Sequence, residues 1–337
     1  MKKNILFSTD NMLGYKENVE KILREKFDVT EYIENYFPLK SERTLYFKLL
    51  RETAKKNKLA KKYYQRYIEK YYFNLLDKYQ KIKFDYFLVV AGREFSKEFI
   101  QELKRRNKGM KCILFVWDRF KYITLRKSAD EFDYIFSFDS RDCEKHGFYF
   151  RPSFYLNEIE QNKIEYSKRK YDIYYVGRLR SRERYKMIEE FYSYSQKINL
   201  NCYLKLYINK ELEKYLPDNY IKDLIIKEMI PYDKNIDIIK NSKCVLDLNV
   251  PDQEGLTLRS IEAIGSETKI ITTNTLIKEY DFYNDKNIYC IEKIEEISLI
   301  PKEFFIEEYK KLPENIKNKY TAKGFIEEIF NVVEKQR

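Results

Sequence analysis

The chain has 337 residues, a formal net charge of +11, five cysteines and a single histidine. Its length allows two domains with substantial cores, and no apolar run approaches the roughly 20 residues of a membrane-spanning helix. The scattered cysteines indicate reduced thiols in a cytoplasmic protein, and histidine-dependent metal sites or catalytic triads would have only His146 to use. We expect no signal peptide, because Met1 and two lysines lead directly into a short strand.

Residues 1–155 are predicted to form a first α/β domain. The segment 84–91 is an almost continuous apolar run, which is typical of a strand covered on both faces. Segments 4–9, 111–117 and 133–138 are read as further strands, with helices over 16–26 and up to Arg106. His146 precedes Gly147 at a predicted helix end, where a structural role is favoured over catalysis.

The loops that follow these strands hold the candidate acceptor-side residues. Asp10, Asp118 and Asp139 each close a strand at its carboxyl end, and each has the alternative role of a helix N-cap. Asn11 and Gly14 lie in the first of these loops. The single Gly14 does not make the G-x-G-x-x-G fingerprint of dinucleotide-binding domains.

The segment 40–83 is strongly basic and is predicted to be a helical insertion in this domain. It holds fourteen Lys and Arg residues against four Asp and Glu, and its aromatic residues recur at helical spacing. Such a helix suits an anionic membrane surface, which would place the protein at the inner face of the cell membrane. Nucleic acid is the rival partner, although no recognised motif accompanies it. Solvated helices packed on the first domain are the third alternative.

A polar linker over 156–170 is expected to lead into a second α/β domain over 171–310, with C-terminal helices over 311–337 that could pack back on the first domain. The second domain begins with a strand and a turn at Gly177. Ser181 then opens a helix whose first turns carry Arg182, Arg184 and Lys186. Cations at a helix N-terminus oppose the macrodipole, so this cluster indicates an anion site, with a solvated basic helix as the alternative.

A second pattern lies between predicted strands over 243–249 and 269–274. Glu254 and Gly255 occupy the loop after the first of these strands, and Glu262 lies about two turns into the helix that follows. Ligands of open α/β sheets bind outside the carboxyl ends of strands, and a helix N-terminus offers free N–H groups to anions. The alternative is a surface loop and helix with two solvated glutamates.

This pattern, Glu-Gly-x6-Glu-Ala, resembles the E-x7-E element of GT-B glycosyltransferases, above all the retaining family 4, and of bacterial capsule and lipopolysaccharide transferases. The resemblance implies that Glu254 meets the transferred sugar and that Glu262 holds the ribose hydroxyls of the donor. Gly255, Leu256 and Thr257 would line the sugar, although family 4 usually has Phe-Gly where this chain has Leu256-Thr257. By layout the resemblance covers nearly the whole chain, and by motif residues 171–275.

The turn at Gly177-Arg178-Leu179 resembles the one that opens the donor domain of these enzymes, where an Arg and a Lys clamp the diphosphate. Arg178 matches that Arg. The position of the Lys is Glu183 here, so Arg182, Arg184 or Lys186 would take its place. Arg259 is a further candidate for the leaving diphosphate. The resemblance also places the nucleobase near residues 227–231, against backbone groups, which makes Pro231 a further candidate for the donor site.

The resemblance implies a GT-B fold, in which two Rossmann-like domains face each other across a cleft. It implies a glycosyltransferase that uses a nucleotide-sugar donor, a glycan or lipid-linked acceptor, and no metal or other cofactor. If the enzyme retains configuration, Glu254 stabilises the sugar. If it inverts configuration, Asp10, Asp118 or Asp139 would act as base. A sugar-nucleotide epimerase or hydrolase of the same fold, or a non-enzymatic membrane or nucleic-acid binder, are the alternative functions.

Overall fold

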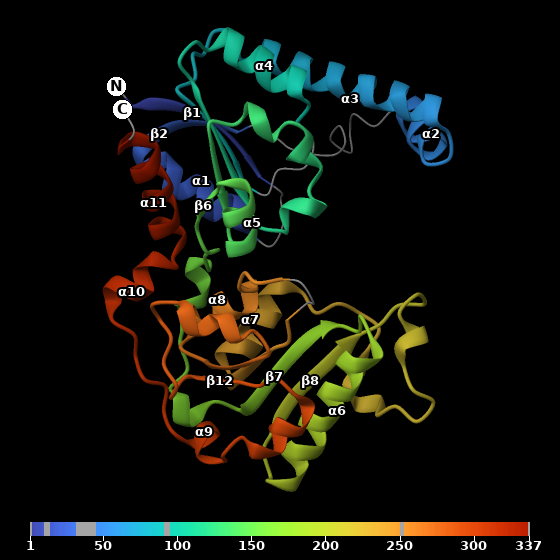
Figure 1. Cartoon of the computed structure of the whole chain (residues 1–337), viewed down its shortest axis with the longest axis vertical. Coiled ribbons are helices and arrows are strands. Elements are labelled where there is room, and N and C mark those ends of the chain that lie inside the picture. Colours follow the sequence, from blue (N-terminus) through green and yellow to red (C-terminus); the bar gives the residue numbers. More distant parts are fainter. Residues whose placement is uncertain (1, 10–13, 32–44, 91–94, 250–252, 336–337) are drawn as a thin grey trace. The chain divides into compact units, whose positions relative to one another are not determined.

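The computed structural model describes residues 2–9, 14–31, 45–90, 95–249 and 253–335 (Figure 1). The chain divides into two compact units. Unit 1 comprises Met1–Arg151 and Ile329–Arg337, and unit 2 comprises Pro152–Glu328. Each unit contains one six-stranded sheet in which all paired strands are parallel. The predicted α/β class with two domains is therefore confirmed.

The sheet of unit 1 has the strand order β2-β1-β3-β4-β5-β6. Its strands are β1 (Lys3–Thr9), β2 (Phe27–Glu31), β3 (Tyr86–Val90), β4 (Lys111–Val116), β5 (Tyr134–Ser137) and β6 (Tyr149–Phe150). All five residues of β3 are buried, as the apolar run predicts for a strand covered on both faces. The sequence did not indicate β2 and β6, and β6 is only two residues long.

The helices of unit 1 are α1 (Tyr15–Lys26), α2 (Leu45–Ala54), α3 (Lys58–Lys78), α4 (Lys97–Arg106) and α5 (Ser140–His146). Helices α3 and α4 pack on one face of the sheet, where Ile68, Leu76 and Phe99 join the core. The end of α11 (Ala322–Lys335) also belongs to unit 1, where Phe330 packs against the rings of Phe27 and Tyr86 at 4.6 and 5.1 Å.

The sheet of unit 2 has the order β12-β11-β10-β7-β8-β9. Its strands are β7 (Tyr171–Arg178), β8 (Cys202–Tyr207), β9 (Ile225–Ile226), β10 (Ser242–Asp247), β11 (Lys269–Thr272) and β12 (Ile288–Cys290). Its helices are α6 (Arg182–Lys197), α7 (Tyr232–Lys240), α8 (Leu258–Ser266), α9 (Glu303–Ile306), α10 (Glu314–Lys319) and the first half of α11. One core cluster lies between the sheet and α6, and a second lies between the sheet and α7 and α8.

The segment 156–170, which we expected to be a polar linker, is part of unit 2. Its Ile159 and Tyr166 are buried, and so is Arg169. The guanidinium of Arg169 donates to the carbonyl oxygens of Ser242, Ser266 and Glu267 at 2.9–3.0 Å. The segment is therefore attached to unit 2 through its buried residues, and Arg169 joins β10 to the end of α8, although most of its other polar side chains are exposed.

Candidate functional site

The predicted donor-site residues of unit 2 gather where β7, β10 and β11 end and α8 begins. The side chain of Thr257 caps α8 by accepting a hydrogen bond from the Ser260 N–H at 3.4 Å. Helix α8 starts at Leu258, so Glu262 is its fifth residue and lies little more than one turn inside it, not two. Parallel strands present their carboxyl ends at one edge, which brings residues far apart in sequence together there.

Glu262 is buried in this cluster, with 6% of its surface exposed. The hydroxyl of Tyr232, the first residue of α7, donates to Glu262 Oε1 at 3.0 Å. Burial disfavours the charged carboxylate and raises the pKa of Glu262 to about 7, although the Tyr232 hydroxyl and the Arg259 charge oppose this shift. Glu262 can therefore change protonation state near neutral pH, and it is not the solvated glutamate of the alternative hypothesis.

Arg259 reaches over the edge of the sheet from the first turn of α8. Its guanidinium donates to the carbonyl oxygens of Val176 in β7 and Leu246 in β10, the latter at 3.4 Å. It lies 4.8 Å from the centroid of the Tyr175 ring and 3.9 Å from Asp247 Oδ1, and one-fifth of its side chain is exposed. Burial lowers the pKa of Arg259, but the two nearby tyrosines and the Asp247 and Glu262 carboxylates outweigh burial and raise it. Arg259 is thus a fixed cation at the site.

Arg184 is also built into this edge. Its Nη1 donates to the Tyr175 hydroxyl at 2.8 Å, and its Nη2 donates to the carbonyl oxygens of Leu248 and Asn249 at 3.2 Å. The ring of Tyr175 consequently lies between two arginines, Arg184 at its hydroxyl and Arg259 at its face. The guanidinium of Arg184 orders the loop after β10, so part of its hydrogen-bonding capacity is already used.

Gly177 is a strand residue, which corrects the prediction of a glycine turn. It lies inside β7 and pairs with Leu206 of β8. A Cβ atom at this position would stand 2.5 Å from the Tyr175 hydroxyl oxygen. Glycine is required here because the Tyr175 ring, two residues earlier on the same face, lies along the strand toward Arg184.

The loop that carries Glu254 is held by two asparagine side chains. Asn274 Nδ2 donates to the Glu254 carbonyl oxygen at 2.8 Å, and Asn249 Nδ2 donates to the Gln253 carbonyl oxygen at 2.5 Å. The Glu254 side chain is half-buried, and Gly255 is buried. Leu256 is 3% exposed and packs in the core between the sheet and α8. Its side chain therefore faces the protein interior, and only its backbone can face a ligand.

Arg178, Arg182 and Pro231 lie on the surface. Arg178 ends β7, and its Nη2 is 3.9 Å from the Met229 sulfur and its guanidinium is 6.0 Å from the Tyr207 ring. Arg178 is thus close to the segment 227–231. Arg184, in contrast, is joined to Arg259 through the ring of Tyr175. Pro231 immediately precedes α7, which begins at Tyr232 as the sequence predicts.

The acceptor-side candidates of unit 1 are more dispersed. Asp10 and Asn11 lie outside the described residues. Asp118 is exposed, and Gly14 adopts φ 77° at the start of α1. Asp139 is buried and caps α5 by accepting from the Asp142 N–H at 3.2 Å, in line with the N-cap alternative.

His146 is the last residue of α5 and is exposed. Its ring stacks on that of Phe148 at a centroid distance of 5.3 Å and lies tilted against that of Phe120 at 4.9 Å. Gly147 ends the helix with φ 69°, the left-handed conformation that favours glycine. These contacts agree with the structural role predicted for this histidine.

Sequence reasoning did not identify the residues that organise the site. Tyr175, Tyr232, Asn249 and Asn274 make the contacts described above. Asp247 is 1% exposed, accepts a hydrogen bond from the Ser260 hydroxyl, and ends β10. Only Asp247 carried a usable signal, since a carboxylate at the end of an apolar strand was the pattern that singled out Asp118 and Asp139.

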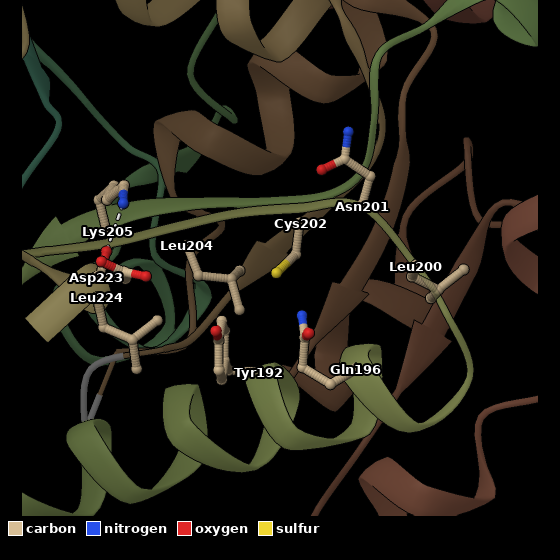
Figure 2. Close-up of a pocket in the computed structure, with 9 residues that line it drawn as sticks. All are labelled: Tyr192, Gln196, Leu200, Asn201, Cys202, Leu204, Lys205, Asp223 and Leu224. Atoms are coloured by element: carbon tan, nitrogen blue, oxygen red, sulfur yellow. Dashed lines mark hydrogen bonds between the residues drawn. The ribbon is translucent and has the colours of Figure 1, made fainter. Parts of the chain in front are cut away.

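A separate cavity of about 270 Å³ lies on the α6 side of the sheet (Figure 2). Tyr192 and Gln196 of α6 face Cys202, Leu204 and Lys205 of β8 across it, and Asp223 and Leu224 close one end. It contains none of the predicted site residues. In the described part of the chain, no group of three or more His, Cys, Asp or Glu side chains could hold a metal ion.

No family model and no curated protein matches the sequence. Solved structures do match, over almost the whole chain. An α-glucosyltransferase in complex with UDP and a 13-mer DNA is 12% identical and has a TM-score of 0.59, with 99% of this chain and 100% of that one covered. A trehalose-6-phosphate protein from E. coli bound with UDP-2-fluoro-glucose is 10% identical with a TM-score of 0.60, and both chains are covered to 98%.

A UDP-N-acetylglucosamine 2-epimerase is 12% identical with a TM-score of 0.53, with 100% of this chain and 96% of that one covered. At these identities the likeness establishes the fold, which is the GT-B fold of two α/β domains, and the fold alone.

Proposed function

We propose that this chain is a glycosyltransferase that moves a sugar from a nucleotide-sugar donor to a glycan or lipid-linked acceptor. The observation that carries this proposal is the buried Glu262, held by Tyr232 and facing the charge of Arg259 at the carboxyl edge of the unit 2 sheet. A buried carboxylate with one hydroxyl partner is an expensive arrangement for stability alone. It suits a site that binds a ligand carrying hydroxyl groups.

In this proposal the donor's ribose hydroxyls donate to Glu262, which must then be ionised. Charge-assisted hydrogen bonds of this kind contribute roughly 1.5–3 kcal/mol each. Arg259 and Arg178 stabilise the diphosphate, and Arg182 and Arg184 are the further cations at the start of α6. Arg184 and Arg259 are already fixed by carbonyl oxygens, so their charges need little reorganisation when a ligand arrives.

Glu254 is proposed to meet the transferred sugar. The amides of Asn249 and Asn274 hold the two carbonyl groups at and before Glu254, which fixes the loop backbone near the start of α8. Gly255 and Thr257 would contribute backbone contacts, as would Leu256, whose side chain is in the core. Glycosyl transfer passes through an oxocarbenium-like transition state, which a nearby carboxylate stabilises. The departing diphosphate carries the negative charge that the arginines balance.

For the biological setting we propose hexosyl or related transfer in bacterial surface-polysaccharide assembly, capsule or lipopolysaccharide, without a metal. This setting is supported by the resemblance of the sequence segment Gly255–Ala263 to transferases of that kind. Asp118 and Asp139 are the described acceptor-side candidates for a base if transfer inverts configuration. The buried, helix-capping position of Asp139 favours Asp118, which is exposed.

A screen of nucleoside diphosphates and nucleotide sugars by thermal shift tests the proposal. One nucleotide should raise the unfolding temperature according to RT ln(1 + [L]/Kd). Glu262→Ala should weaken its binding, whereas Glu254→Ala should lower turnover and leave nucleotide affinity nearly unchanged. No response to any nucleotide, or unchanged binding and turnover in both variants, would refute the donor site.

An epimerase or hydrolase acting on the same donor is the second candidate, because a UDP-N-acetylglucosamine 2-epimerase shares the fold. This enzyme would bind the same nucleotide sugar and need no acceptor glycan. The two functions separate when purified protein is incubated with the donor alone. Release of free nucleotide together with the epimeric sugar would identify an epimerase, and donor consumption that depends on an added glycan would identify a transferase.

A further inference from the structure

The outer end of the α2–α3 hairpin in unit 1 exposes leucines and tyrosines among lysines. Eleven large hydrophobic side chains are exposed in the described part of the chain, and five of them lie within residues 45–63. They are Leu45 (74% exposed), Tyr46 (60%), Leu49 (60%), Leu59 (69%) and Tyr63 (59%). Single exposed leucines are ordinary on a protein surface, but a cluster of this kind marks an interaction surface.

The hairpin has an inner part that packs on unit 1 and an outer part that does not. Ile68 and Leu76 of α3 are buried in the core of unit 1, and Phe73 meets Phe99 of α4 at 6.1 Å. Before Ile68, the first two turns of α3 are exposed or half-exposed. Figure 1 shows α2 at the end of α3 farthest from α4.

Helix α2 is fixed on α3 through its inward face. Phe47 is 1% exposed and its ring lies 5.7 Å from Tyr64 and 5.6 Å from Tyr67. Leu45 and Leu49 are four residues apart, so they lie on one face of the helix, as do Leu59 and Tyr63 on α3. The packed aromatic contact of Phe47 therefore fixes α2 on α3, and the exposure of the leucines does not come from fraying of the helix.

The same surface is strongly basic. Residues 45–63 contain seven Lys and Arg residues, at positions 48, 51, 55, 56, 58, 61 and 62, and one acidic residue, Glu52. Glu52 is paired with Lys55 at 2.8 Å. Within the described residues, Lys56, Lys58, Lys61 and Lys62 have no ion-pair partner. Exposed apolar side chains together with exposed lysines match a surface that is anionic outside and apolar beneath.

We propose that the outer end of the α2–α3 hairpin docks on an anionic lipid bilayer, with the lysines at the headgroups and Leu45, Tyr46, Leu49, Leu59 and Tyr63 inserted between them. Leucine side chains would enter the acyl boundary, and tyrosines prefer the headgroup level. A nucleic acid would engage the lysines equally well but gains nothing from exposed leucines, so the leucines favour lipid. Among the described helices, none has the length and hydropathy to cross a bilayer.

Co-sedimentation with vesicles tests this proposal, using equal parts of phosphatidylcholine and phosphatidylglycerol against phosphatidylcholine alone. The parent chain should bind the anionic vesicles, and rising salt should release it because screening shortens the reach of surface charges to about 10 Å at 0.1 M. The quadruple variant Lys56→Gln, Lys58→Gln, Lys61→Gln, Lys62→Gln should lose about 600-fold in partitioning, since each lysine contributes a factor of about five.

The double variant Leu45→Ser, Leu59→Ser should lose at least about tenfold, because two apolar side chains no longer leave water. Matched controls come from unit 2. Replacing Lys210, Lys222, Lys293 and Lys302 by Gln removes the same charge from exposed positions, and Leu299→Ser with Ile306→Ser removes two equally exposed apolar side chains. Both controls should bind vesicles as the parent does. All these positions are exposed, so unchanged circular dichroism is expected.

Four outcomes would overturn the proposal. The first is that the chain binds neutral and anionic vesicles equally, and the second is that the unit 2 controls also lose vesicle binding. The third is that the leucine variant keeps its vesicle binding in full, and the fourth is that the parent chain does not bind vesicles at all. Duplex DNA is included as a competing probe. If DNA binds, if the lysine variant abolishes that binding and if vesicles do not bind, the surface recognises nucleic acid. If light scattering shows a dimer that Leu45→Ser, Leu59→Ser dissociates, the surface joins two copies of the chain.

Discussion

The carboxyl edges of the two sheets differ in what their charged residues do. In unit 2, Arg259 and Glu262 are tied to Tyr175, Tyr232 and Asp247, and the pKa of Glu262 is raised to about 7. In unit 1, Arg119 lies 3.6 and 3.5 Å from the buried Asp139 and Asp142. Those two carboxylates accept hydrogen bonds from the main-chain N–H groups of Asp142 and Phe120.

In unit 1, Asp139 and Asp142 thus accept main-chain hydrogen bonds, although Nε and Nη1 of the neighbouring Arg119 have no hydrogen-bond partner among the described residues. In unit 2, the buried Glu262 accepts from the Tyr232 hydroxyl, and its pKa is raised to about 7. Perturbed ionisation of this kind concentrates at functional sites. A carboxylate after a strand is therefore not in itself a site. What distinguishes Glu262 is the raised pKa of its buried carboxyl group, because buried polar atoms without a hydrogen-bond partner occur in both units, at Asp247 Oδ1 and in the guanidinium of Arg119.

The largest effect is expected from removing the arginine of each edge. Arg259→Ala and Arg119→Ala should each cost about 3 kcal/mol of folding free energy, because each leaves buried carboxylates or carbonyl groups without their cation. Only Arg259→Ala should also weaken nucleoside diphosphate binding, and the loss of binding free energy should be roughly 1.5–3 kcal/mol. Denaturant unfolding and calorimetry below the unfolding temperature measure the two effects. An equal loss of nucleotide affinity in both variants would mean that reduced stability, and not a lost contact with the nucleotide, weakens binding.

The pH dependence of stability should distinguish the two edges next. Glu262 has an ordinary pKa of 4.5 and a pKa of about 7 in the folded chain, so the folded state holds the proton more tightly. Protonated Glu262 therefore stabilises the folded state fully at pH values below its pKa in the unfolded chain, and this stabilisation is lost as the pH rises through about 7. The loss amounts to about 3 kcal/mol.

Denaturant unfolding across this pH range provides the measurement. Glu262→Gln, which cannot ionise, should flatten the profile. Asp139→Asn is the comparison from unit 1, where it should lower stability because it removes the charge beside Arg119. A parent profile that coincides with that of Glu262→Gln would show that Glu262 does not titrate in this range.

A smaller effect is expected from one glycine in each unit. Gly177→Ala should cost about 1–3 kcal/mol, since its Cβ meets a Tyr175 hydroxyl that Arg184 holds in place. Gly147→Ala should cost about 1 kcal/mol, because its φ is 69° but nothing lies within 4 Å of the new Cβ. Thermal unfolding compares them, and Gly177→Ala should in addition weaken nucleotide binding. A neutral Gly177→Ala would mean that Tyr175 moves freely.

The smallest effect is expected from Tyr232→Phe. Losing its hydroxyl removes a hydrogen bond that lowers the pKa of Glu262, so the pKa should rise further. Nucleotide affinity at neutral pH should fall by about 1 kcal/mol, and its dependence on pH should move upward. Tyr203→Phe, which removes a tyrosine hydroxyl from β8, is the control. Equal behaviour of the two variants would remove Tyr232 from the site.

The sequence was sufficient to predict the elements that carry the site. The apolar runs before Glu254 and after Glu262 correspond to β10 and β11, and the parallel sheet follows from alternating strands and helices. The exact start of α8 was misjudged because Thr257, not an earlier residue, caps it. The two-residue β6 was missed because a pattern needs several residues to be visible.

The contacts inside the site could not be predicted, because they join residues that lie far apart in the chain. Tyr232 reaches Glu262 across 30 positions, and Arg259 reaches Val176 across 83. No local pattern indicates such pairs. The role of Gly177 was likewise hidden, since glycine usually marks a turn and only the direction of the Tyr175 ring explains it inside a strand.

We infer that Glu262 must ionise to bind a nucleotide. Calorimetry with the nucleotide sugar found in the thermal-shift screen, whose diphosphate diester does not ionise near neutral pH, is carried out near about pH 6.5 in buffers of different ionisation enthalpy and measures protons released on binding. The parent should release more than about half a proton per nucleotide sugar, falling to none above about pH 8.5, and Glu262→Gln should release none at any pH. Binding without proton release by the parent, or equal release by Glu262→Gln, would contradict this inference.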